Sequence, residues 1–287
     1  MLPWFLATAA FVTASLPLIA QTEQELLEQE LVASSDQHMR DELGVNDITT
    51  PSIASILKDL DSFRPVPIAT ISANKRDAVF ESRMQTAIHL GSLVADGFML
   101  TIAERPQDLE EIGKALIRQS RALGVGDRLT KRSKSLLELS SQGDWIGMRA
   151  ELIQTQSDVE QAMMDLRDEE MAHMISLGGW LRGFQLAAIS TNENYSAERA
   201  AILGRTEIMD YFLDRLDTLH PRLKATEFAT RLTSSLREIR MVAIETQGNP
   251  PTPEQVASMA RLATDAMSVA LGPVDTEGNI LPSTPQP

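Results

Sequence analysis

A glutamate and a histidine three residues apart, Glu170 and His173, have the clearest metal-binding spacing in this sequence. Residues at i and i+3 lie on one face of a helix, and carboxylate-bridged di-iron bundles take two ligands from one helix in this way. Such a centre also needs a second Glu-x-x-His and two further glutamates. The nearest second candidate has Asp217 in place of Glu ahead of His220, and Pro221 then ends the helix. The pattern is incomplete, so a di-iron-like oxidoreductase is one alternative. In the other interpretation, Glu170 pairs with a buried arginine.

A second candidate site follows the glycine pair Gly178-Gly179. Two successive glycines disfavour a helix by about 1 kcal/mol each and predict a kink or a break there. In a functional interpretation, the glycine pair is a hinge, or Trp180 and Arg182 form the wall of a pocket and hold an anionic ligand. In a structural interpretation, Trp180 fills the core and Arg182 neutralises a buried carboxylate, for which Glu170 is one candidate.

Small and polar residues recur at helical spacing on two further segments. Gly179, Gly183 and Ala187 are four apart and predict the close approach of another helix. A polar strip occupies one face of the apolar segment 75–104 and consists of Gln85, His89, Ser92 and Asp96. We expect this strip to meet solvent or a polar groove, and the alternative is a hydrogen-bonded network inside the bundle.

Complete catalytic motifs are missing from the sequence. There is no cysteine, and there are four histidines in 287 residues. The sequence also lacks a phosphate-binding glycine loop, a His-Glu-x-x-His motif and a Gly-x-Ser-x-Gly motif. We therefore assign no catalytic residue and no cofactor, and the sequence favours a protein that is not an enzyme.

The elements that position these residues are predicted to be helices. Strand alternation and hairpin turns are nearly absent, whereas helix-ending glycines and prolines recur. Ser196 is a predicted N-cap, and Thr252 begins a predicted capping box with Pro253 at the first helical position. The expected helices are 75–104, 107–123, 127–141, 144–177, 180–191, 196–219, 222–246 and 253–271. The predicted fold is an all-α, irregular multi-helix bundle of about eight helices.

The bundle domain is expected to span residues 75–271. Residues 21–74 are predicted to form an acidic helical arm and an extended, proline-containing connector. Residues 272–287 carry four prolines and are predicted to be a disordered tail.

The first twenty residues carry no charged side chain and have the pattern of an export signal. An apolar run from Trp4 to Leu16 is broken by Pro17, and a small residue, Ala20, precedes a hydrophilic stretch. We expect residues 1–20 to be a cleaved signal peptide, which leaves no stable membrane span, although an uncleaved anchor is the alternative. The mature protein is then extracytoplasmic, and periplasmic if the host is a Gram-negative bacterium.

Composition and charge restrict the partners. A net charge of −14 disfavours nucleic acid, because binding a phosphate backbone requires a basic surface. We favour a non-enzymatic interaction or scaffold protein of the cell envelope with a protein partner. The alternatives are a ligand-binding or sensing module near Trp180, Arg182 and His89, and the metal-dependent oxidoreductase built on Glu170 and His173. Each alternative requires parts that the sequence supplies incompletely.

Overall fold

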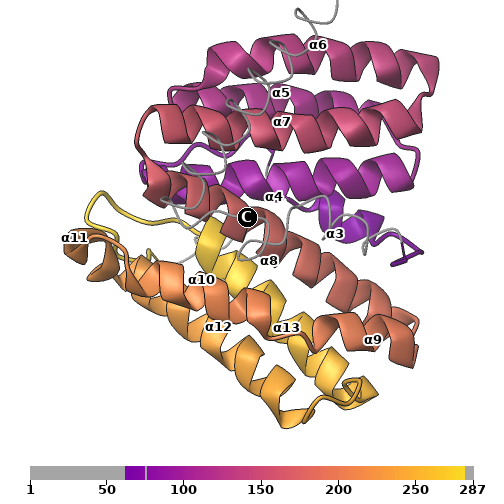
Figure 1. The fold of residues 1–287 in the computed structure, drawn as a ribbon, viewed down its shortest axis with the longest axis vertical. Coiled ribbons are helices and arrows are strands. Elements are labelled where there is room, and N and C mark those ends of the chain that lie inside the picture. Colours follow the sequence, from indigo (N-terminus) through magenta and orange to yellow (C-terminus); the bar gives the residue numbers. More distant parts are fainter. Residues whose placement is uncertain (1–61, 75, 282–287) are drawn as a thin grey trace, which may run out of the picture. The chain divides into compact units, whose positions relative to one another are not determined.

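Helices make up nearly all the secondary structure in the computed structural model, which describes residues 62–74 and 76–281 (Figure 1). The described part of the chain contains eleven helices, and its one β-type pairing is an isolated bridge between Val274 and Ile280. The all-α prediction is therefore confirmed. The helices are α3 (Ile68–Ser72), α4 (Arg83–Ile102), α5 (Pro106–Ala122), α6 (Gly126–Gln142), α7 (Trp145–Asp165), α8 (Glu169–Glu193), α9 (Ala197–Leu203), α10 (Glu207–Asp217), α11 (Pro221–Lys224), α12 (Glu227–Glu245) and α13 (Pro253–Leu271). The expected signal peptide and nearly all of the expected arm lie outside the described residues.

Local capping chemistry decides where several helices begin. The Ser196 hydroxyl accepts a hydrogen bond from the Arg199 amide and starts α9. Thr252 and Gln255 form the predicted capping box, and α13 begins at Pro253 as expected. The helix also ends at the expected residue, Leu271. Helix α4 starts later than expected, at Arg83, because the Ser82 hydroxyl caps it.

The predicted break at Gly178-Gly179 is wrong, because both glycines lie inside the continuous helix α8. The chain breaks earlier instead, between α7 and α8, where Arg167 has a φ of 54°. The glycines are needed for packing: a Cβ added at Gly178 would lie 2.0 Å from the carbonyl oxygen of Ile88 on α4. A Cβ added at Gly91 would lie 1.9 Å from the Ile175 oxygen and 2.6 Å from the Gly179 nitrogen. The predicted close approach at Gly179 is thus confirmed, and its partner is α4.

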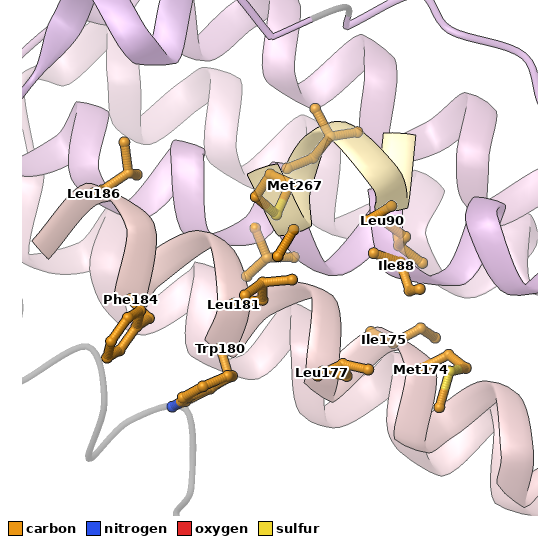
Figure 2. Close-up of a cluster of buried hydrophobic side chains, with 14 of the residues drawn as sticks. Ile88, Leu90, Met174, Ile175, Leu177, Trp180, Leu181, Phe184, Leu186 and Met267 are labelled. Carbon is orange, nitrogen blue, oxygen red and sulfur yellow. The ribbon is translucent and has the colours of Figure 1, made fainter. Parts of the chain in front are cut away.

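This crossing of α4 and α8 is the centre of the bundle. All residues of α4 after Arg83 are buried, and so are most of those on α8. Helices α5 and α7 pack against α4, and α6 covers α5 and α7. Helix α13 packs against α8 and α4, α12 packs against α13, and α10 lies against α12 and α8 (Figure 1). Ile88 and Leu90 of α4 and Ile175 of α8 belong to one cluster of buried apolar side chains (Figure 2).

Two segments beside the bundle differ from expectation. The connector was expected to be extended, but residues 68–72 form the short helix α3, and Phe63 before it is fully buried. The tail was expected to be disordered from Gly272, but its described residues, 272–281, are ordered. It folds back through a bond from the Leu281 amide to the Pro273 carbonyl (2.9 Å), and the Phe228 amide donates to Gly278 (3.0 Å). None of the helices in residues 62–74 and 76–281 has the length and apolar character needed to cross a bilayer.

Candidate functional site

A buried ion pair joins the two central helices. Arg182 Nε on α8 donates to Asp96 Oδ1 on α4 at 2.7 Å, and neither side chain is more than 5% exposed. Asn74 Nδ2 donates to the other Asp96 oxygen at 2.6 Å. Two more Arg182 nitrogens donate to the Gln185 side chain (2.6 Å) and the Thr70 carbonyl (2.9 Å). Burial raises the pKa of the Asp96 carboxyl, and the Arg182 guanidinium acts against that rise. Arg182 therefore does neutralise a buried carboxylate, as the structural interpretation expected.

The polar strip on α4 is fully buried, so the expectation that it meets solvent or a polar groove is wrong. The C-terminal end of α13 covers it at one end, where Gln85 Nε2 donates to the carbonyls of Ala270 (3.1 Å) and Gly272 (2.8 Å). At the other end Asp96 meets Arg182. The alternative expectation, hydrogen bonding within the bundle, describes both ends of the strip.

The three residues proposed to share a pocket, Trp180, Arg182 and His89, do not converge on a common space. Trp180 packs against Phe184 and against Phe212 of α10, with ring centroids 5.3 and 5.6 Å apart. Trp180 and Phe184 project from the side of α8 that faces away from Ile88 and Leu90 of α4 (Figure 2). Arg182 reaches Asp96 of α4 and the carbonyl of Thr70 on α3. The fully buried His89 ring meets Phe80 edge-on, with centroids 5.2 Å apart.

Glu170 and His173, the proposed metal ligands, engage different partners. Glu170 Oε1 accepts a hydrogen bond from the backbone amide of His220 at 2.6 Å, just ahead of α11. His173 Nδ1 lies 3.0 Å from the hydroxyl of Tyr211 on α10. Glu170 is half-buried, and Arg182, the arginine considered as its partner, is bound to Asp96 instead. Within the described ranges, no group of three or more His, Asp or Glu side chains is placed to hold a metal ion.

His173 has an altered ionisation. Its side chain is enclosed between α8 and α10, and the residue is 8% exposed. Burial lowers the pKa of His173 to about 4, and the positive charge of Arg215 acts in the same direction. The imidazole is therefore neutral near pH 7, and Tyr211 lies within hydrogen-bond distance of its Nδ1.

An open hollow lies where four segments meet, and we call it the acidic hollow. It has a volume of about 400 Å³. The segments are the start of α4, the start of α8, the junction of α11 and α12, and the turn at residues 275–278, which we call the C-terminal turn. Its acidic lining residues are Glu81, Asp168, Glu170, Asp275 and Glu277, and its apolar ones are Met84, Met171, Leu223 and Phe228. The one basic lining residue, Arg83, is bound to Asp168 at 2.6 Å. The acidic hollow therefore combines an apolar floor with a negative rim.

Sequence reasoning missed the acidic hollow because its parts are far apart in the chain. Acidic residues are common in the first turns of helices, where they stabilise the helix dipole, so Glu170 near the start of α8 did not indicate a surface. Ser82 was an available signal that α4 begins here, but a cap does not show which other helix ends lie beside it. The C-terminal turn had been assigned to a disordered tail.

No family model, curated protein or solved structure matches this chain. The residues and their geometry are thus the basis for a functional assignment.

Proposed function

We propose that this protein is an exported, non-enzymatic interaction protein of the cell envelope, and that it binds its partner at the acidic hollow. The observation that carries this proposal is a contrast in accessibility. The polar groups best suited to chemistry are enclosed and engaged by the fold, whereas the acidic hollow is open and carries the exposed carboxylates of Glu81 and Glu277 at its edge.

The enclosed groups act mainly in holding helices together. Asp96 and Arg182 join α4 to α8, and the enclosed His173 lies within hydrogen-bond distance of Tyr211 on α10. A catalytic acid, base or nucleophile must lie within hydrogen-bond reach of its substrate. Fully buried side chains such as Asp96 and His89 do not meet that condition in this conformation.

The acidic hollow has the properties of a binding surface. Ligand sites combine apolar lining with a few convergent polar groups, and the hollow has both. Its volume also falls in the range of small-molecule pockets, roughly 300–1,000 Å³, which favours the sensing module as a second candidate at this place. Export is supported by the pattern of residues 1–20, which lies outside the described residues.

Site-specific photocrosslinking tests the interaction. A photoreactive amino acid is placed in the full chain at the exposed rim residue Thr276 or, as a control, at the exposed residue Glu138 on α6, and each protein is produced in its native host. We expect a covalent adduct of discrete mass from position 276 and none from position 138. Equal adducts from both positions, or none from 276, would contradict the proposal.

N-terminal sequencing tests export. The mature protein from the native host is expected to begin at Gln21 and to be recovered outside the cytoplasm. A chain that keeps Met1 and fractionates with cytoplasmic proteins would contradict export without bearing on the acidic hollow.

A further inference from the structure

We propose that the partner enters the acidic hollow with a cationic, partly apolar protein segment, in which lysine or arginine side chains flank an apolar side chain. This inference rests on the proposed function and specifies the chemistry of the partner.

The charge of the lining favours a cation. Five of the lining side chains are acidic and one is basic, and that one, Arg83, already binds Asp168. Asp275 stays ionised, because hydrogen bonds from Asn279 hold the pKa of its carboxyl below the ordinary value. An approaching anion would meet repulsion from several sides, whereas a cation would find carboxylates around it. Charge complementarity of this kind steers association and excludes wrongly charged partners.

The floor favours a ligand that also has apolar groups. Met84, Met171 and Phe228 are buried beneath the opening, and Leu223 is half-buried beside it. Methionine side chains adapt their shape to different apolar ligands. Lysine and arginine carry an apolar stem that can cover such a floor while the charged end stays near the rim. A small inorganic cation would leave the floor uncovered.

Neither of the two ends of the chain outside the described residues provides such a segment. The segment between the expected signal and residue 61 is itself acidic, with Glu23, Glu25, Glu28 and Glu30 close together. The last six residues carry no charged side chain. A second copy has the same net charge of −14 and is repelled. We therefore assign the cationic segment to a different protein.

Binding of a labelled probe peptide to the full chain tests this assignment. The probe is a short fluorescein-labelled peptide of alternating lysine and leucine, and its counterpart alternates glutamate and leucine. Fluorescence anisotropy at low salt is expected to detect binding of the lysine peptide alone. Replacing both exposed rim residues, Glu81→Gln with Glu277→Gln, is expected to weaken binding about tenfold, because each lost charge contributes on the order of 0.5–1 kcal/mol.

A second double variant separates the rim from the overall charge of the protein. Glu138→Gln with Glu245→Gln removes the same charge, but Glu138 lies on α6 and Glu245 ends α12 about 27 Å along that helix from its start. We expect this control to change affinity less than about twofold. A third variant, Thr276→Trp, puts a bulky side chain at the rim and is expected to reduce binding without any change in charge.

The inference is overturned if both peptides bind equally, if neither binds, or if the two double variants lose affinity to the same extent. The photocrosslinking result is independent of these outcomes. If position 276 gives an adduct but the rim variant binds the lysine peptide as tightly as the native chain does, the proposed interaction stands and the cationic segment is rejected. An adduct of twice the mass of the chain would identify a second copy and reject the separate partner. A bound lysine peptide without any adduct would reject the proposed function.

Discussion

The side chain of His173 illustrates how the fold controls a single ionisable group. It lies between two helices, beside Tyr211 and near Arg215, and has a pKa of about 4. An unfolded chain restores the ordinary value of about 6.5. The unfolded state therefore binds more protons than the folded state between these pH values, so stability falls as the pH falls.

We expect His173 to make the free energy of unfolding depend on pH. Its contribution is complete above about pH 6.5 and is lost as the pH falls towards 4, with a total of about 3 kcal/mol. Urea unfolding of the native chain and of His173→Gln, measured at several pH values, checks this. The variant should show a flatter dependence across that range. Parallel curves for the two proteins would mean that His173 titrates normally in the folded state.

The buried pair of Asp96 and Arg182 predicts a large loss of stability when one partner is removed. Arg182→Ala leaves Asp96 enclosed without its main cation, which is expected to cost about 3–5 kcal/mol in urea unfolding. The double variant Arg182→Met with Asp96→Leu is expected to recover much of that loss. Lys114→Ala, which removes an exposed pair with Glu110, serves as the control and should cost less than about 1 kcal/mol. A small effect of Arg182→Ala would show that the pair is weakly coupled.

At the scale of helices, the contact between α4 and α8 depends on glycine. Gly178→Ala would place a methyl group 2.0 Å from a backbone oxygen of α4, and that oxygen can move only if the helices separate. We expect a loss of about 3 kcal/mol or more and a lower melting temperature. Gly113→Ala on α5 is the matched control, because a Cβ there meets nothing within 4 Å. That variant should be stabilised by about 0.5–1 kcal/mol, and similar melting curves for both would refute the close crossing.

Sequence patterns predicted that helices form, and where several of them begin, better than they predicted the breaks between helices. Capping residues act locally, so Ser196 and Thr252 marked the starts of α9 and α13 correctly. The glycine pair on α8 led to the wrong prediction of a break. Helix propensity alone disfavours glycine inside a helix, but the close packing of α4 against α8 requires glycine at this place. Whether a glycine ends a helix or admits a neighbour depends on a segment more than 80 residues away, and the sequence does not specify that pairing.

The candidate site was less predictable than the fold. The spacing of Glu170 and His173 places them near one another on α8, but their partners come from separate places, the His220 amide and the α10 residue Tyr211. One of the two interpretations of Arg182, that it neutralises a buried carboxylate, was correct, although the carboxylate is Asp96, in the strip that was expected to be exposed. The acidic hollow forms where four segments that are distant in the sequence lie together, and only the tertiary structure brings them there.

For the molecule as a whole, the shared use of α8 predicts cooperative unfolding. Residues 62–74 and 76–281 all belong to one compact unit, and helices from both halves of this part of the chain pack against α8. Thermal unfolding followed by tryptophan fluorescence and by far-ultraviolet circular dichroism should give coincident transitions. Two separated transitions would indicate that α4–α7 and α9–α13 unfold independently.

The place of α13 in the chain has a consequence for the order of events in folding. This last helix covers both α8 and α4, although it follows α4 by about 150 residues. Contacts between such distant segments slow folding, because a long loop must close before they contribute. A nascent chain that ends before Pro253 therefore leaves apolar surface of α4 and α8 without its final cover. Such unfinished chains are the species that we expect to aggregate, or to require a chaperone, during biosynthesis.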